Sequence, residues 1–213
     1  MRSSRTLICI AALCASLAGC SSSSNNAKPL TPADTAIRSG PAPSEFKASF
    51  DTSRGTFLVL VHRDWSPLDA DRFYQLIKIG FFDGARFFRV VPGFIVQFGI
   101  NGDPRIQEQW HEQNVPDDPV KEKNQRGTLA FAKAGPNTAT TQIFINLGNN
   151  SGSLDPQGFS PFGGVVEGMS VVDNLYSGYG EQPQQPQIEG QGNQYLETNF
   201  PKLDYIKTAK IVP

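Results

Sequence analysis

Two segments of the chain bring together side chains that could act on a substrate. Residues 87–99 read FFRVVPGFIVQFG and carry Arg89, Phe94 and Gln97, while residues 127–145 carry Lys133 and Gln142 among small and apolar residues. An arginine is always charged and holds its N–H groups in a rigid fork, so a fixed guanidinium can stabilise electron density that develops beside it. Chemistry of this kind requires no nucleophile, general base or metal.

Other reaction classes find little support in the sequence. The only histidines, His62 and His111, do not belong to a metal-ligand spacing. Asp103, Asp117 and Asp118 lack the regular acidic pattern of a calcium loop and are expected to be solvated turn residues. We find no serine-hydrolase elbow, phosphate-binding loop, dinucleotide fingerprint or recognisable pair of catalytic carboxylates. We therefore expect neither a metal nor a cofactor.

The two segments, together with a third that runs from Leu154-Asp155 to Glu167-Gly168-Met169, are similar to the signature segments of the cyclophilins. The first shares with them the order and spacing of an aromatic residue, an Arg, a Pro-Gly-Phe and a Gln. The resemblance covers about residues 46–213. It implies a mainly β fold, a closed eight-stranded antiparallel β-barrel capped by two α-helices, and peptidyl-prolyl cis-trans isomerase activity.

The resemblance also implies a role for each site residue. Rotation about an X-Pro bond crosses a barrier of about 18–20 kcal/mol, and a cationic donor beside the prolyl nitrogen favours the twisted amide. Arg89 would be that donor, and Phe94 and Gln97 complete the catalytic set. The substrate would be a proline-containing peptide or unfolded protein, bound as an extended strand with little sequence selectivity. The implied substrate-binding residues are Ile95, Ala132, Lys133, Gln142, Phe144, Leu154, Phe159 and Phe162.

The chain departs from common family members at three positions. Ser153 stands where many eukaryotic relatives have a Trp, Phe159 stands where a His is common, and Ile95 replaces a pocket methionine. A separate alternative is a non-catalytic peptide-binding or chaperone module on the same frame. Retention of Arg89 together with Phe94 and Gln97 argues against it, since a binder needs the groove but not the aligned cation.

The periodicity of apolar residues predicts the elements that position these side chains. We expect a β-hairpin over 46–61, a helix from about Pro67 to Ile79, and strands over 87–98, 129–132, 142–147, 162–166 and 203–212. A short helix is expected near 170–176, and 101–126 is expected to be a long loop with modest internal order. Residues 178–194 are rich in Gly, Gln and Pro, so we expect little core there. Residues 178–200 are treated as a loop that borders the groove or serves a partner.

The N-terminus has the layout of a secretion signal. Residues 1–19 have a basic start and an apolar run that is too short to cross a bilayer. Leu17-Ala18-Gly19-Cys20 resembles a bacterial lipobox, which implies cleavage before Cys20 and acylation of its thiol; the alternative is an ordinary signal with a chance cysteine. Residues 20–44 are then a lipidated cysteine and flexible tether, and 45–213 the catalytic domain.

Composition narrows the set of partners. Nineteen basic and 20 acidic residues give a net charge of −1, so nucleic acid is not expected to bind. Contact with a membrane is expected through the N-terminal lipid alone, on the extracytoplasmic (periplasmic) face of a bacterial membrane, where Ser21 favours the outer membrane.

Fifteen Phe residues predict a core built on phenyl rings. We expect a monomer.

Overall fold

The computed structural model describes residues 40–213. The predicted signal peptide, Cys20 and most of the predicted tether lie outside the described residues. Residues 42–44, which we expected in the tether, contact the domain: Ala42 is buried and its N–H donates to Asp71 Oδ1 at 2.8 Å, and Ser44 O accepts from Arg63 N. The folded part therefore begins a few residues before the first strand.

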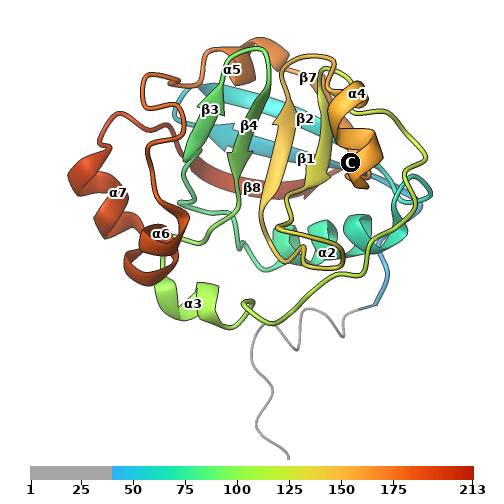
Figure 1. The fold of residues 1–213 in the computed structure, drawn as a ribbon, viewed down its shortest axis with the longest axis horizontal. Coiled ribbons are helices and arrows are strands. Elements are labelled where there is room, and N and C mark those ends of the chain that lie inside the picture. The colour runs from blue at the N-terminus through green and yellow to red at the C-terminus, as the bar shows by residue number, and fades with distance from the viewer. Residues whose placement is uncertain (1–39) are drawn as a thin grey trace, which may run out of the picture.

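Eight antiparallel strands form one curled sheet, as expected (Figure 1). Its order is β3-β4-β6-β5-β7-β2-β1-β8. The two ends of this order meet where residues 84–87 bond to residues 204–206, through an isolated bridge between Arg86 and Tyr205 and flanking backbone bonds. The strands are β1 (Glu45–Thr52), β2 (Gly55–His62), β3 (Arg89–Val91), β4 (Ile95–Phe98), β5 (Thr128–Phe131), β6 (Ile143–Asn146), β7 (Gly163–Glu167) and β8 (Ile206–Val212).

The predicted hairpin and first helix are confirmed. In β1 and β2 alternate residues are buried, and the rings of Phe50 and Phe57 stack at 4.9 Å across the pair. Helix α2 (Pro67–Lys78) begins at a proline, which suits the first turn because that position needs no N–H. Its apolar face, including Phe73 and Leu76, is fully buried in the sheet.

Phenylalanine dominates the core, as the composition predicts. Rings from several strands and from α2 contact one another inside the curled sheet. Edge-to-face and tilted contacts prevail, which is the geometry that ring quadrupoles favour. The large, fully buried side chains are Trp110, Leu76, Leu129, and phenylalanines 50, 57, 73, 81, 82, 87, 88, 98 and 162.

The helical content exceeds the two expected helices in the described part of the chain. Short helices are α3 (Pro104–Glu108), α4 (Ser151–Leu154), a 3-10 turn (Asp155–Gln157), α5 (Met169–Asp173), α6 (Gln185–Gln191) and α7 (Asn193–Asn199). Helix α5 is the short helix predicted near 170–176, and α3 supplies the modest order expected in the 101–126 loop. Between residues 40 and 213 we find no helix with the length and apolarity to span a bilayer.

The stretch 178–200, which was expected to be a loop, contains two helices, although within 178–194 the buried hydrophobic side chain is Ile188 alone, as the expectation of little core requires. Helices α6 and α7 lie together beside α3 on one flank of the sheet (Figure 1). Ile188 and Leu196 are each 1 % exposed and pack with Phe88, Ile100 and Leu203 in a cluster separate from the main core. Two apolar residues eight positions apart give no periodic signal, and they are buried because the outer face of the sheet offers Phe88 and Ile100 as a partner surface.

Candidate active site

The register of the strands aligns four side chains of the site in one row. In the β3–β4 pair Arg89 lies opposite Gln97, in β4–β6 Gln97 lies opposite Phe144, and in β5–β6 Phe144 lies opposite Ala130. Directly opposed residues share a face of the sheet, so these four side chains form one row across four strands. A guanidinium and an amide are therefore placed beside an apolar surface by backbone pairing alone.

The turn between β3 and β4 carries Phe94 over this row. Gly93 has φ +76°, and the Phe94 carbonyl accepts from Leu147 N and Asn150 Nδ2, both at 2.8 Å. Gly148 admits this close approach, because a Cβ there would lie 2.4 Å from the Gly93 carbonyl oxygen. The guanidinium carbon of Arg89 lies 5.6 Å from the centre of the Phe94 ring.

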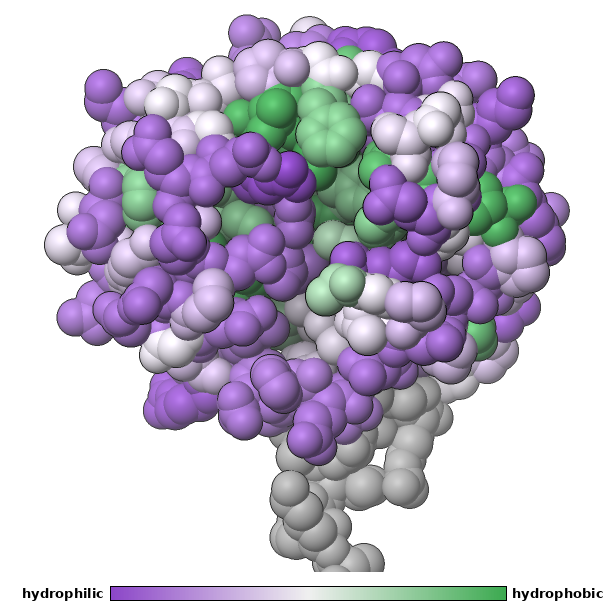
Figure 2. Space-filling model, in the orientation of Figure 1, coloured by the Kyte–Doolittle hydropathy of each residue, from purple (hydrophilic) through white to green (hydrophobic). Residues whose placement is uncertain are grey.

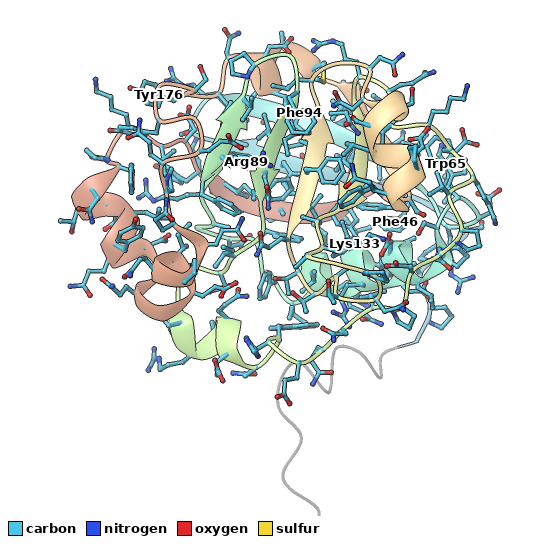
Figure 3. All side chains as sticks on the ribbon, in the orientation of Figure 1. Phe46, Trp65, Arg89, Phe94, Lys133 and Tyr176 are labelled. Atoms are coloured by element: carbon cyan, nitrogen blue, oxygen red, sulfur yellow. The ribbon has the colours of Figure 1, made fainter. Side chains whose placement is uncertain are left out.

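An apolar pocket of about 340 Å³ opens beside Arg89. Ile95, Phe144 and Leu154 are buried in a small cluster of their own, with Phe94, Ala132 and Phe159 packed against it. Figure 2 shows an apolar patch hollowed into this face and bordered by hydrophilic residues, and Figure 3 shows Arg89, Phe94 and Lys133 on the same face. The predicted residues that line the pocket are Arg89, Phe94, Ile95, Gln97, Ala132, Lys133, Phe144, Leu154 and Phe159.

Phe162 is the predicted substrate residue that the structure places elsewhere. Its side chain is fully buried in the main core, with its ring 5.0 Å from Phe73 and 5.5 Å from Phe131. The backbone of residue 162 bonds to Leu129 O and turns the ring inward, beneath the sheet rather than into the pocket. The assignment of Phe162 to substrate binding was therefore wrong, and Phe159 supplies the wall on that side, edge-on to Phe144.

Four polar side chains form a hydrogen-bonded row along one edge of the pocket. Arg89 Nη1 donates to Gln97 Oε1 at 3.1 Å, Gln97 Nε2 to Gln142 Oε1 at 2.9 Å, and Gln142 Nε2 to Gln185 Oε1 at 3.1 Å. Gln97 and Gln142 each accept one bond and donate one, which fixes the orientation of both amides, and Gln185 ends the row as an acceptor. The predicted contact of Gln97 with Arg89 is thus present, and Gln142 lies one step further along.

Lys133 contributes its backbone and stem to the pocket rather than a free charge. Its ammonium donates to Asp117 Oδ2 at 2.7 Å and to Gly158 O at 2.8 Å, and its side chain is 7 % exposed. The neighbouring Ala132 N–H already donates to Gln142 O. The cation that remains beside the pocket is therefore Arg89.

Sequence reasoning missed Glu181, the second partner of Arg89. Arg89 Nε donates to Glu181 Oε1 at 2.7 Å, and Nη2 contacts the same oxygen. With Nη1 bonded to Gln97, the guanidinium keeps one N–H on each terminal nitrogen for a ligand. Glu181, like Gln185, comes from the Gly-, Gln- and Pro-rich stretch after α5. The composition of this stretch indicated only a loop near the groove. No sequence pattern indicated that Gln157 of the 3-10 turn lines the pocket.

Comparison with known proteins identifies the family. The model of the cyclophilin-type peptidyl-prolyl cis-trans isomerase family matches residues 47–191. The chain belongs to the cyclophilin-type peptidyl-prolyl cis-trans isomerases. As a cyclophilin it is an enzyme that interconverts the cis and trans forms of X-Pro bonds, which confirms the activity that the motifs imply.

Curated relatives and solved structures agree with this placement. The chain is 34% identical over 135 residues to peptidyl-prolyl cis-trans isomerase B of Escherichia coli, covering 60% of this chain and 82% of that one. It is 32% identical over 134 residues to an Acinetobacter baylyi isomerase, covering 58% and 68%. A Cryptosporidium parvum cyclophilin-type isomerase shares the fold, with a TM-score of 0.59 at 21% identity over 79% of this chain and 98% of that one.

Proposed function

We propose that Arg89 is the catalytic group of this cyclophilin and that the apolar pocket holds the proline ring of the substrate. The observation that supports this most directly is the row in which Arg89 and Gln97 stand beside Phe144. A related Cryptosporidium parvum structure was determined in the presence of the dipeptide Ala-Pro, which is consistent with a proline-containing ligand.

The proposed mechanism is preferential binding of the twisted amide. Twisting ends amide resonance and localises a lone pair on the prolyl nitrogen, so a guanidinium N–H directed at that nitrogen binds the twisted form better than either planar isomer. Glu181 and Gln97 hold the guanidinium on two sides, so little reorganisation is needed when the amide twists.

The lowering of the activation barrier that catalysis requires is larger than Arg89 alone can supply. Raising a rate from about 10⁻² s⁻¹ to about 10³ s⁻¹ lowers the barrier by roughly 7 kcal/mol. One charge-assisted hydrogen bond contributes about 1.5–3 kcal/mol. The apolar pocket supplies the remaining stabilisation of the transition state. It holds the proline ring while the preceding residue rotates, and it excludes water from the contact with Arg89.

The decisive experiment is Arg89→Ala in a soluble form that starts at Gly40, so that the Ala42 contact is kept. The cis-to-trans rate of a short X-Pro peptide is measured. We expect kcat/KM to fall by about 10²–10³ while peptide affinity falls much less. Full activity in the variant would overturn the role of Arg89, and a wild type without activity would favour the non-catalytic binding module.

We further propose that the enzyme assists the folding of extracytoplasmic proteins while anchored to a bacterial membrane. The support is the sequence: residues 1–19 have the layout of a secretion signal, and Leu17-Ala18-Gly19-Cys20 resembles a lipobox. Unfolded clients released at a membrane would meet the active site nearby, where X-Pro isomerisation otherwise takes tens to hundreds of seconds.

A further inference from the structure

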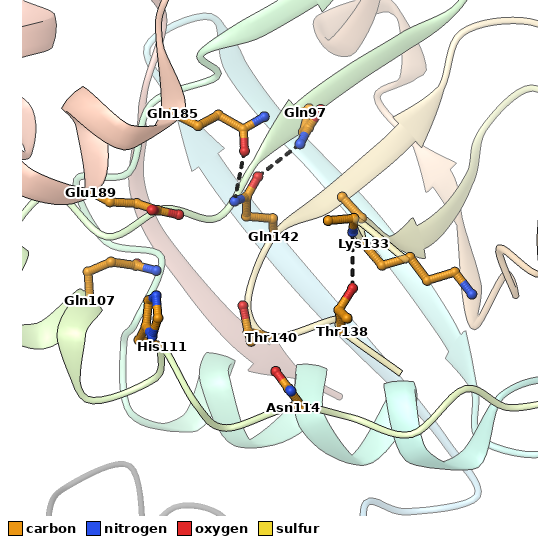
Figure 4. A pocket seen from close by; sticks show the side chains of 12 residues that line it. Gln97, Gln107, His111, Asn114, Lys133, Thr138, Thr140, Gln142, Gln185 and Glu189 are labelled. Atoms are coloured by element: carbon orange, nitrogen blue, oxygen red, sulfur yellow. Dashed lines mark hydrogen bonds between the residues drawn. The ribbon is translucent and has the colours of Figure 1, made fainter. Parts of the chain in front are cut away.

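A second pocket, here called the polar pocket, adjoins the apolar one. It has a volume of about 520 Å³ and shares Gln97, Ala132, Lys133 and Gln185 with the apolar pocket (Figure 4). Successive residues of an extended peptide advance by about 3.3 Å. A peptide whose proline occupies the apolar pocket therefore has a side chain within reach of the polar pocket.

Glu189 gives the polar pocket an unpaired negative charge. Its half-buried carboxylate extends from α6 toward the open space of the pocket (Figure 4). Among the described residues it has neither a hydrogen bond nor an ion pair. Lys133 does not neutralise it, because its ammonium is taken by Asp117 and Gly158.

The surroundings of Glu189 favour the binding of a cation to its carboxylate. Burial raises the pKa of Glu189, the charge of His111 opposes that shift, and Glu108 adds to it. His111, which is exposed, also lines the pocket. A partly desolvated carboxylate without a partner gains more from an incoming positive charge than one in open water.

Helix α6 presents Glu189 from an anchored position. The adjacent Ile188 is 1 % exposed in the cluster with Phe88 and Leu196, and Gln185 at the start of the helix accepts from Gln142. The helix is therefore fixed both to the sheet and to the polar row of the active site. A charge on so fixed an element can select among substrates at little entropic cost.

We propose that the polar pocket binds a basic side chain, lysine or arginine, of the peptide whose proline is being isomerised, and that Glu189 is the residue that recognises it. This inference rests on the proposed function, because it assumes that the proline occupies the apolar pocket. It makes the enzyme selective for prolines that have a basic residue nearby.

The first experiment is a positional scan at pH 8. Peptides with one X-Pro bond carry Lys, Gln or Glu at each of the three positions before the proline and the two after it. At one position we expect kcat/KM for Lys to exceed that for Gln by about threefold to tenfold and that for Glu by more, with the ratio shrinking as salt is added. If no position favours Lys over Gln, the inference is overturned while the proposed function stands. Inactivity on every peptide would overturn both.

Variants of Glu189 then test whether this residue causes the preference for Lys over Gln. In Glu189→Gln the Lys-to-Gln ratio at that position is expected to fall to about one, and in Glu189→Lys the Glu peptide is expected to become the better substrate. The matched control is Glu112→Gln, which removes the same charge from an exposed residue that does not line the pocket; it is expected to keep the ratio. A ratio unchanged in Glu189→Gln, or lost equally in the control, would contradict recognition by Glu189.

Discussion

At the scale of single residues, the arginine at the centre of the site is held by partners of different origin. Gln97 comes from the adjacent strand and was expected there, whereas Glu181 comes from the stretch after α5. The Glu181 side chain is 62 % exposed, so the pair with Arg89 is a modest one energetically. Its significance lies in orienting the guanidinium rather than in stabilising the fold.

The contribution of Glu181 can be measured by a double-mutant cycle. Glu181→Ala is expected to lower kcat/KM by about threefold to tenfold, because the guanidinium loses one of its two fixed partners. The same substitution in the Arg89→Ala background is expected to have no further effect. An equal loss in both backgrounds would show that Glu181 acts on the surrounding loop instead, and a gain in activity would show that it withholds the cation from the substrate.

At the scale of elements, α6 and α7 connect the flank of the sheet with the active site. Their apolar anchor is the cluster of Phe88, Ile100, Ile188, Leu196 and Leu203. Phe88 precedes Arg89 directly, so packing of Phe88 against this cluster supports the position of Arg89 beside the pocket.

Truncation of this anchor tests its contribution to stability. Leu196→Ala is expected to lower the free energy of unfolding by about 2–4 kcal/mol, because Leu196 is 1 % exposed and its removal leaves a cavity. Leu68→Ala is the control, since Leu68 is 40 % exposed on α2 and should cost far less. Denaturant unfolding of both variants gives the comparison, and similar losses would mean that α6 and α7 are not anchored by this cluster.

The strands and the long helix were predictable because each buries a periodic set of apolar residues. The hairpin over 46–61 and the helix beginning at Pro67 are found within a residue or so of their predicted bounds. Most of the pocket was also predictable, since it is built from two contiguous motifs. Phe162 was misplaced because a motif does not reveal on which side of the sheet a ring lies. Glu181 and Glu189 could not be assigned, because their neighbours Ile188 and Leu196 are too sparse to indicate a folded element.

At the scale of the whole molecule, one buried carboxyl group should make stability depend on pH. Burial raises the pKa of Asp69 to about 7, with the Ser66 hydroxyl opposing that shift and Asp118 adding to it. Ser66 Oγ lies 3.0 Å from both Asp69 Oδ2 and Asp118 Oδ2. One hydroxyl hydrogen cannot serve both carboxylates, and a proton on Asp69 resolves the conflict.

The sign of the pH effect follows from linkage. The unfolded chain releases this proton near pH 4, whereas the folded chain retains it to about pH 7. Between these values the unfolded state binds fewer protons, so the free energy of unfolding falls as pH rises. Asp69→Asn has no carboxyl group to titrate at this position, so its free energy of unfolding should not fall in this way. We expect the free energy of unfolding of Asp69→Asn minus that of wild type to increase by roughly 2–4 kcal/mol from pH 4 to pH 7.5. Exposed Asp64→Asn should show no such trend. Parallel pH profiles for Asp69→Asn and wild type would contradict the assignment.

The proposed membrane anchor can be tested only in the full-length chain. Cys20→Ser in the full-length protein, expressed in a bacterium, is expected to move it from the membrane fraction to the soluble fraction while isomerase activity is retained. Activity should be kept because the composition of residues 20–44 predicts a flexible tether between the proposed lipid and the catalytic domain. Equal membrane retention of wild type and variant in a fractionation experiment would contradict the lipoprotein interpretation.

The pairing of β1 with β8 sets the order of events in biosynthesis. Ser49 lies opposite Lys210, so β1 obtains one of its two neighbours only after β8, far along the sequence, has been synthesised. Contacts between strands that are far apart in sequence close a long loop and form slowly. Until then the other edge of β1 is open to pairing with foreign strands. The sheet can therefore be completed only after β8 has been synthesised, and deletion of β8 would leave β1 unpaired on that edge.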